Sequence, residues 1–227
     1  MWFVAEIGLN HDGNFDLAYE LIRRAKESGA TAVKFQFGWR DGPGEINQID
    51  LARAQQLAEW CEYLDIAWFA SLITEEAFDL ALDIGLERYK IASRTVVDNP
   101  KLCERILSEG KETFVSLGFW EGQEWPFGEP NEKLHYIFCR SLYPTYPKDL
   151  CLPDKFETSG YYGYSDHCHG ISACLLALSR GARFIEKHFT LNKTSQVIRD
   201  HVMSSTPEEF ADLTRFGGEI ARLVECE

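Results

Sequence analysis

The sequence contains no long apolar run, no basic N-terminal stretch and no tract of biased composition. A membrane span needs about 18 uninterrupted apolar residues, and a secretory signal begins with basic residues ahead of an apolar stretch. Residues 1–4 instead lead directly into a segment with the composition of a strand. Hydrophobic residues make up 45% of the 227 residues and charged residues 26%, as in ordinary globular proteins. We therefore expect a cytoplasmic protein with no membrane partner.

Basic residues are scarce relative to acidic ones. Lys and Arg total 23 against 36 Asp and Glu, so the formal net charge is −13 at pH 7. Binding to a nucleic-acid backbone depends on basic surface, and nucleic acid is therefore not expected as a partner. An anionic small molecule would need a few cations placed around it locally.

The seven cysteines form no CxxC pair and show no zinc-ribbon spacing. Their number is odd, and no secretory signal accompanies them. Because disulfides are rare in cytosolic proteins, we expect reduced thiols. Most of the cysteines lie within apolar helical or strand patterns, where a free cysteine behaves as a small core residue.

Short apolar runs alternate with helical patterns from one end of the sequence to the other. Eight segments have the composition of strands: 2–9, 32–37, 67–72, 88–93, 113–118, 134–141, 161–167 and 183–190. The clearest helical patterns cover 15–28, 50–64, 75–84, 99–109, 170–180 and 207–225. The connections after the fifth and sixth strands, 119–133 and 142–160, contain several Pro and Gly and are expected to be irregular.

Eight strand–helix units predict a compact (β/α)8 barrel, the TIM barrel, with residues 1–227 as one catalytic domain. An open doubly wound sheet alternates in the same way and is the competing architecture. The barrel is favoured by the number of strands and by the polar residues near the end of almost every strand. In a barrel these ends meet at one mouth.

Polar side chains near the strand ends fall on one face of each strand, since alternate residues point to the same side. Charges buried in this way are costly unless they pair or bind a ligand. Taken singly, each residue also has a structural explanation, such as a buried lysine–glutamate pair or a serine that turns the chain. Together, two lysines, three hydroxyls and two histidines predict an anion site beside a metal site, formed by Lys34, Lys90, Ser93, Ser116, Ser165, His167 and His188. On the same strand faces lie Glu6, Gln36, Ser141, Tyr143 and Glu186.

His167 and His188 are the candidate metal ligands, because they end neighbouring predicted strands. Two histidines, with water or substrate oxygens beside them, suit a divalent ion such as Mn²⁺ that acts as a Lewis acid. His167 and His169 also form an HxH pattern, as in metal-dependent hydrolases. That pattern usually comes at the first strand, whereas here it comes late and His169 is expected in a loop.

Several segments at these positions resemble the sialic acid (N-acetylneuraminate) synthase family. They are 5–13 (AEIGLNHDG), 34–36 (KFQ), 90–93 (KIAS), 143–145 (YPT), 163–167 (GYSDH), 186–191 (EKHFTL) and 200–201 (DH). The resemblance spans almost the whole chain, and the order and spacing of the segments are highly specific. It implies a transferase that condenses phosphoenolpyruvate with an N-acetylhexosamine-like aldose, yielding a nine-carbon 2-keto-3-deoxy acid and phosphate.

The resemblance also implies roles for individual residues. The phosphate and carboxylate of phosphoenolpyruvate would be held by Lys34, Lys90, Ser93, Ser116, Ser141 and Ser165. The manganese ligands would be His167 and His188. The sugar would be surrounded by Glu6, Gln36, Tyr143 and Asp200, and among these Glu6 is the carboxylate best placed for proton transfer.

The sequence departs from the family pattern directly after residues 90–93. Relatives usually continue with Gly and an acidic residue that contacts the sugar, whereas this chain has Arg94 and Thr95. We therefore expect a shifted sugar preference, toward a more anionic acceptor.

Relatives also carry a C-terminal antifreeze-like domain that closes the partner subunit's site, and the sequence resembles only their barrel. We expect a separate antifreeze-like protein or a homodimer to provide this closure. Alternatively, segment 119–133, with Trp120, Trp125 and Phe127, folds over the mouth as a lid. Packing of these aromatic side chains beneath the loop is the other interpretation.

Two other functions compete with the synthase. One is a non-catalytic barrel subunit that binds phosphoenolpyruvate or sugar and needs a partner domain. The other is different barrel chemistry on a phosphorylated sugar, such as isomerisation or hydrolysis. The presence of both lysines and both histidines argues against a barrel that has lost its activity.

Overall fold

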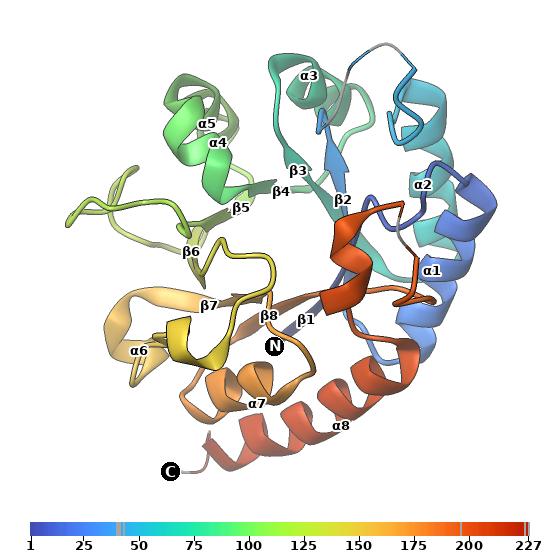
Figure 1. Cartoon of the computed structure of the whole chain (residues 1–227). Helices are drawn as coiled ribbons and strands as arrows, with labels where there is room; N and C mark the ends of the chain where they lie inside the picture. The colour runs from blue at the N-terminus through green and yellow to red at the C-terminus, as the bar shows by residue number, and fades with distance from the viewer. Residues whose placement is uncertain (40–41, 43, 196, 225, 227) are drawn as a thin grey trace.

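The computed structural model describes residues 1–39, 42, 44–195, 197–224 and 226. Within these residues, eight parallel strands form a closed barrel in the order β1-β2-β3-β4-β5-β6-β7-β8, and β8 returns to pair with β1. Figure 1 looks along the barrel, with the strands as a ring and helices around it. The predicted barrel is confirmed, and the open sheet is excluded.

All of the predicted strands are present, with ends that differ by a few residues. Their bounds are β1 (Trp2–Gly8), β2 (Ala32–Phe37), β3 (Ala67–Leu72), β4 (Arg88–Ile91), β5 (Glu112–Ser116), β6 (Leu134–Cys139), β7 (Tyr161–Asp166) and β8 (Phe184–His188). Two ends were placed wrongly by the sequence pattern. Ser93 is the first residue of a short helix, α4 (Ser93–Asp98), rather than part of β4, because this helix begins only two residues after the strand. Ser141 lies in the loop beyond β6, where polar residues continue the alternation of the strand before them.

The predicted helices are also present, with additional short ones. Their bounds are α1 (Phe15–Glu27), α2 (Leu51–Tyr63), α3 (Glu75–Asp83), α4 (Ser93–Asp98), α5 (Pro100–Ser108), α6 (Phe156–Ser159), α7 (Ser172–Ser179) and α8 (Pro207–Val224), with the 3-10 turns η1 (Pro147–Asp149) and η2 (Arg199–Met203). Residue 225, the end of the last predicted helix, lies outside the described residues. The sequence pattern missed α4, because six residues are too few to show a helical period. No helix in the described ranges is both long and apolar enough to cross a membrane.

Local side-chain contacts explain where the longest helices begin. The side chain of Asn14 accepts hydrogen bonds from the first backbone N–H groups of α1. Before α8, the Glu209 backbone N–H donates to Thr206 Oγ1 and the Glu209 carboxylate accepts from the Thr206 backbone N–H. This reciprocal pair satisfies two donors that the helix itself leaves free.

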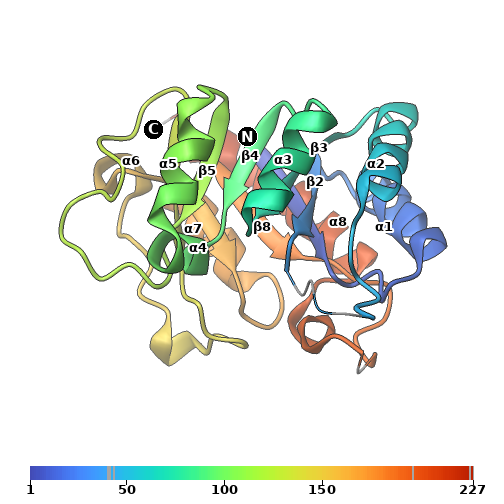
Figure 2. The ribbon, with the colours of Figure 1, turned by 90° about the horizontal axis from the view of Figure 1, so that it is seen from above.

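The interior of the barrel is divided into an apolar and a polar layer. The apolar layer lies where the strands begin and consists of Val4, Ala32, Phe69, Phe114, Ile137 and Phe184. The ring centroids of Phe114 and Phe184 are 4.6 Å apart. Two residues further along each strand, the side chains on the same face are polar or cysteine. Figure 2 shows the loops after the strands at one end of the barrel, opposite both chain termini, so the polar layer lies at the loop end.

The irregular segment 119–133 covers the outside of the barrel. Figure 1 shows it outside the strand ring. The indole of Trp125 stacks on the ring of Tyr136 from β6, with centroids 4.5 Å apart and planes 8° apart. Trp120 and Phe127 also pack against the core. The lid hypothesis is therefore wrong for Trp120, Trp125 and Phe127, because these side chains cover the outer wall where other units have a helix. Phe119, at the start of the segment, lines the cavity described below. The alternative, packing beneath the loop, is confirmed.

All seven cysteines are free thiols. Five of them are buried, at Cys61, Cys103, Cys139, Cys168 and Cys174, and the other two are exposed. Both the reduced state and the placement of most cysteines in the interior are as expected from the sequence.

Replacing Trp125 with Ala should destabilise the barrel. The loop would lose its contact with the outer face of β6, and we expect the free energy of unfolding to fall by about 2–3 kcal/mol, somewhat less than for a fully buried Trp. Urea denaturation measures the change. As a control, Tyr63→Ala removes an aromatic ring that is 80% exposed and should change stability by less than about 0.5 kcal/mol. Equal stability of the two variants would contradict the assigned role of the loop.

Candidate active site

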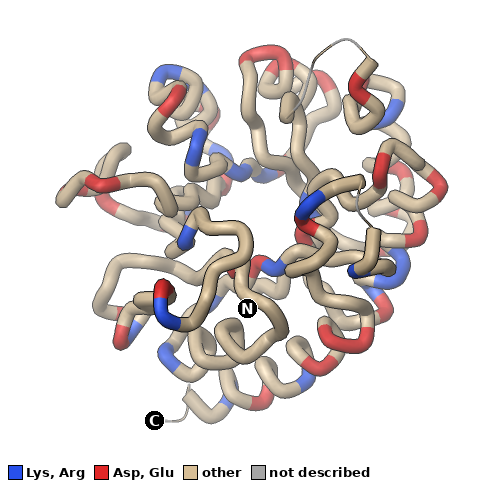
Figure 3. Tube along the Cα trace, in the orientation of Figure 1, with Lys and Arg blue, Asp and Glu red and all other residues tan. Residues whose placement is uncertain are grey.

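A cavity of about 560 Å³ lies at the loop end of the barrel. This volume is typical of sites for small ligands. Every site residue predicted from the sequence lines it: Glu6, Lys34, Gln36, Lys90, Ser93, Ser116, Ser141, Tyr143, Ser165, His167, His188 and Asp200. The structure thus brings these side chains together from several strands and loops, while the role of each stays a prediction. Figure 3 shows that many Asp and Glu lie on the surrounding helices and loops, away from the interior.

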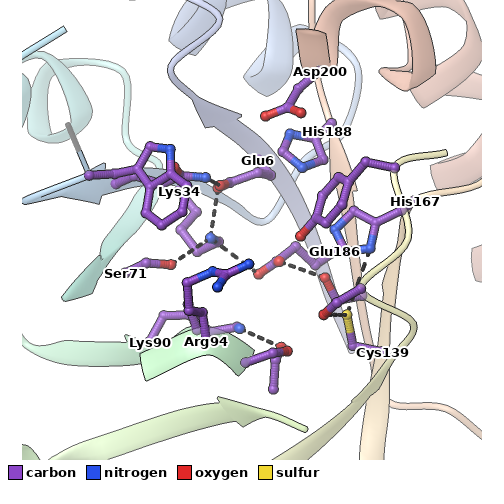
Figure 4. A pocket seen from close by; sticks show the side chains of 18 of the residues that line it. Glu6, Lys34, Ser71, Lys90, Arg94, Cys139, His167, Glu186, His188 and Asp200 are labelled. Carbon is purple, nitrogen blue, oxygen red and sulfur yellow. Dashed lines mark hydrogen bonds and ion pairs between the residues drawn. The ribbon is translucent and has the colours of Figure 1, made fainter. Parts of the chain in front are cut away.

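Lys34 lies at the centre of a buried charge network. Its Nζ is 2.9 Å from Glu6 Oε2 and 3.7 Å from Glu186 Oε2, and it donates to Ser71 Oγ at 2.9 Å. Figure 4 shows the ammonium between the two carboxylates. The side chains of the three charged residues are between 2% and 7% exposed. Gln36 Nε2 donates to the other oxygen of Glu6 at 2.8 Å, which fixes that carboxylate.

Lys90 is a second buried cation, and its surroundings are different. Its Nζ donates to Ser116 Oγ at 2.6 Å. Among the described residues, no carboxylate lies within ion-pair distance of it, although the side chain is 2% exposed. Burial lowers the pKa of Lys90, because the charged form has lost its water. A buried ammonium that lacks a direct counter-ion is suited to hold an anionic ligand.

Serine hydroxyls line the same cavity as this cation, and two of them are arranged to donate. Ser116 accepts from Lys90, and Ser93 Oγ accepts from the Gly118 backbone N–H at 2.9 Å. A hydroxyl that accepts in this way keeps its own proton for another acceptor. Ser165 Oγ instead donates to Glu186 Oε1 at 2.8 Å.

The two carboxylates beside Lys34 have opposite pKa shifts. Burial raises the pKa of Glu6 to about 7, and the nearby Glu186 adds to this effect while Lys34 opposes it. Burial also disfavours the charged form of Glu186, but Lys34 and Lys90 outweigh it and lower the pKa to about 2. Paired carboxylates with separated pKa values divide the work of acid–base catalysis. Glu6 can therefore exchange a proton near neutral pH, whereas Glu186 stays ionised.

His167 and His188 lie next to each other at the cavity, with ring centroids 5.6 Å apart (Figure 4). Nδ1 of His167 donates to the carbonyl oxygen of Arg140 at 2.9 Å, so that in the neutral imidazole Nε2 carries the lone pair. Burial acts to lower the pKa of His167, but Cys139 and the Arg140 carbonyl outweigh it and raise the pKa, so a bound metal would displace a proton. Burial lowers the pKa of His188 to about 4, which keeps that imidazole neutral. Its buried Nδ1 has no hydrogen-bond partner among the described residues. Two imidazoles with free lone pairs fit a divalent metal ion.

The number of protein ligands at this position is small. Within the described ranges, no group of three or more His, Cys, Asp and Glu is arranged to hold a metal ion. A metal between His167 and His188 would therefore complete its coordination with water or substrate oxygens. His169 is exposed, which argues against the HxH hydrolase interpretation.

A buried ion pair in the barrel wall supports His167. Lys187 Nζ is 2.8 Å from Asp166 Oδ2, and both side chains are fully buried. The other oxygen of Asp166 accepts from Tyr164 Oη at 2.7 Å and from the Cys168 backbone N–H at 2.8 Å. Since His167 lies between Asp166 and Cys168 in the chain, these contacts fix its backbone and hence the direction of its ring.

The loop after β8 is tied to the loop after β1. His201 Nε2 is 2.9 Å from Asp12 Oδ1, and its Nδ1 is 2.7 Å from Thr190 Oγ1. This contact joins two of the segments that resemble the synthase family, 5–13 and 200–201. It also explains how Asp200, the neighbour of His201 in sequence, lies beside His188 in Figure 4.

The sequence analysis left several cavity residues without a role. Glu186 comes two residues before His188, so both side chains point to the same face of β8. This alternation is the signal that could have identified Glu186 as a site residue. Ser71 is a lone serine in the apolar strand β3, and Cys139 was treated as a core residue although its Sγ lies 3.7 Å from His167 Nδ1. Arg199 also lines the cavity, and no local pattern pointed to it.

Comparison with known proteins links this cavity to one family. Residues 45–224 match the model of the NeuB family. The N,N'-diacetyllegionaminic acid synthase of Legionella pneumophila is 31% identical over 254 residues, which cover 94% of this chain and 70% of the relative. The human N-acetylneuraminate-9-phosphate synthase is 28% identical over 267 residues, which cover 100% of this chain and 74% of the relative.

A solved structure agrees with these matches. The N-acetylneuraminic acid (sialic acid) synthetase of Leptospira borgpetersenii superposes with a TM-score of 0.86 at 29% sequence identity. The superposition covers 97% of this chain and 84% of that chain.

Replacing either candidate metal ligand should abolish metal binding. We expect His167→Ala and His188→Ala to weaken Mn²⁺ binding at least 10-fold, because the loss of either histidine leaves the ion with a single protein ligand. Electron paramagnetic resonance of free Mn²⁺ measures the affinity without any substrate. His169→Ala, which changes the exposed histidine of the HxH pattern, is the control and should bind normally. Unchanged affinity in the first two variants would refute the assignment.

Proposed function

The chain belongs to the NeuB family, and from this membership we propose that it is a synthase that condenses phosphoenolpyruvate with an aldose. The product is a 2-keto-3-deoxy nonulosonic acid, and phosphate is released. The names of the relatives, synthases of legionaminic and neuraminic acids, support this class of reaction. The free thiols support a cytoplasmic location.

One observation carries the proposal beyond family membership. Lys90 is a buried ammonium with no direct counter-ion among the described residues, and it contacts the Ser116 hydroxyl in a cavity that Ser93 also lines. Phosphoenolpyruvate bears a phosphate and a carboxylate and supplies the missing negative charge. Lys34 lies in the same cavity and would hold the second anionic group. Donors fixed in place before the substrate arrives need no reorganisation during the reaction.

We propose that His167 and His188 hold a divalent ion, with Mn²⁺ as the first choice. Such an ion polarises the aldehyde oxygen of the open-chain sugar when it is bound. Gln36, Tyr143 and Asp200 line the same cavity and would contact the sugar.

The reaction requires one new carbon–carbon bond and the loss of phosphate. C3 of phosphoenolpyruvate attacks the aldehyde carbon, and positive charge develops at C2. Water adds to C2 and loses one proton, which leaves a hydroxyl on C2. The C2–O bond to phosphate then breaks, and the hydroxyl proton passes to the departing phosphate, so that the 2-keto group is left. Holding both substrates in one cavity removes much of the entropic cost of bringing them together.

The two carboxylates beside Lys34 have different tasks in this scheme. Glu6, with its raised pKa, gives its proton to the former aldehyde oxygen and recovers one from the attacking water. Glu186 stays ionised and stabilises the positive charge that develops at C2. A non-catalytic binding subunit needs neither a proton donor nor a group that stabilises developing charge. The different pKa values of the two carboxylates therefore favour the synthase over that alternative.

The mouth of the cavity needs a cover, because water in an open site weakens electrostatic stabilisation. Phe119 lines the cavity, but Trp120, Trp125 and Phe127 pack on the outer wall, so these residues do not supply that cover. We propose that an antifreeze-like domain on a separate protein, or a second copy of the chain, closes the site.

Removing the Lys90 ammonium should abolish most of the activity. With phosphoenolpyruvate, Mn²⁺ and a panel of aldoses, we expect the wild type to release phosphate. Lys90→Ala should lower kcat/KM for phosphoenolpyruvate by about 10²–10³, the range for loss of one preorganised charge contact. Lys101→Ala, which changes an exposed lysine on α5, is the control. Activity of Lys90→Ala equal to that of the control would refute the anion site.

The pH dependence of the reaction should follow Glu6. As an acid it must be protonated, so kcat/KM should fall as pH rises through about 7. Glu6→Gln should lose this dependence and at least 10²-fold in rate. Glu112→Gln changes a carboxylate at the other end of the barrel and should keep the wild-type profile. A wild-type profile that rises through pH 7 would instead make the Glu6 carboxylate a base, and an unchanged profile in Glu6→Gln would exclude it from proton transfer.

A further inference from the structure

Two arginines at the rim of the cavity have no task in the proposed reaction. Arg94 is the second residue of α4, and Arg199 is the first residue of η2. Both line the cavity. Their side chains are 55% and 66% exposed, compared with 3% for Lys34. The cavity therefore has two cations at its floor and two at its rim.

Each arginine is held against an aromatic ring of the same cavity. The guanidinium carbon of Arg94 lies 5.0 Å from the ring centroid of Phe119, and that of Arg199 lies 4.7 Å from the ring centroid of Tyr143. Stacking of this kind fixes the plane of the guanidinium but leaves its N–H groups free at the edges. Both groups are thus oriented before any ligand binds.

The carboxylates nearest to these arginines neutralise them weakly. Arg94 Nη1 is 3.9 Å from Asp98 Oδ2, and Arg199 Nε is 3.4 Å from Asp200 Oδ1. The pair of Arg94 is exposed on both sides and contributes little, whereas in the pair of Arg199 the Asp200 side chain is 15% exposed. Each pair uses one of the five N–H donors of its arginine. Most donors at the rim remain available to a ligand. Figure 4 shows the side chain of Arg94 reaching over the floor of the cavity.

The positions of the two arginines fit the far end of an acceptor. In the ring of eight strands, β4 and β8 lie opposite each other, so Arg94 and Arg199 flank the mouth from opposite sides. The aldehyde of the acceptor must point to the floor, where phosphoenolpyruvate would lie between the two lysines. The end of the acceptor remote from the aldehyde must then point to the rim.

We propose that Arg94 and Arg199 bind an anionic group, a phosphate or a carboxylate, at the end of the acceptor aldose remote from its aldehyde. This inference rests on the proposed function, since it assigns the acceptor class of the same site. It gives a physical reason for Arg94, at which the chain departs from the family pattern. Two cations at the rim would also concentrate anions at the mouth of a protein with a net charge of −13.

Matched acceptors test the proposal. N-acetylmannosamine is compared with its 6-phosphate, and mannose with mannuronic acid, by calorimetric binding to the Mn²⁺-loaded protein and by phosphate release with phosphoenolpyruvate. We expect at least one charged acceptor to bind about 10-fold to 100-fold more tightly than its neutral counterpart, as for hydrogen bonds to charged groups. The two pairs distinguish phosphate from carboxylate.

Variants locate the source of the preference. Arg94→Gln and Arg199→Gln should each reduce the ratio of charged to neutral affinity at least 5-fold. The control is Arg215→Gln, because Arg215 likewise stacks on an aromatic ring, that of Phe216, and pairs with Asp212 at 2.9 Å, but lies on α8 outside the barrel. This variant should keep the wild-type ratio.

Equal binding of charged and neutral acceptors by the wild type would overturn the inference. It would also be overturned if Arg94→Gln weakened phosphoenolpyruvate binding as much as acceptor binding, because Arg94 would then belong to the floor. A preference for the charged acceptor without any phosphate release would support the rim site and count against the synthase. The binding and turnover measurements therefore separate the two failures.

Discussion

The contact of Lys34 with Glu6 and Glu186 is the interaction on which the rest of the site depends. It crosses the seam at which the barrel closes, because Glu6 is in register with Lys34 on one side and with His188 on the other. An ammonium and two carboxyl groups buried this deeply are tolerated only when they stay paired and hydrogen-bonded. The closed barrel supplies that pairing, so fold and site depend on the same contacts.

The charge distribution divides the cavity by depth. The outer surface is strongly acidic, yet the floor holds two buried ammonium groups and the rim holds two stacked guanidinium groups. Net charge therefore says little about the ligand of this protein, and local placement decides it. An acidic exterior and a cationic pocket are compatible because exposed charges are screened by salt within about 10 Å, whereas buried ones are screened much less.

Connections after the strands have different tasks around the barrel. Most units cover their strands with a helix, but after β5 the aromatic residues of 119–133 take this place. The loop after β8 is clasped to the loop after β1 by Asp12 and His201, and it carries both Asp200 and Arg199 to the mouth. The parts of the chain that shape the mouth of the cavity are thus loops and short helices, whereas the strands form its floor.

The sequence by itself determined the strands, the longer helices and the residues at the floor of the cavity. The spacing of hydrophobic residues and the alternation of side chains along a strand are local properties, so they can be read without knowing the fold. Lys34 and His188 were found in this way. Tertiary structure alone decided that Trp125 covers the outer wall, that Arg199 reaches the mouth and that Glu6, rather than Glu186, holds a proton near pH 7. Each of these depends on neighbours distant in sequence, and burial and Coulomb energy are set by such neighbours in space.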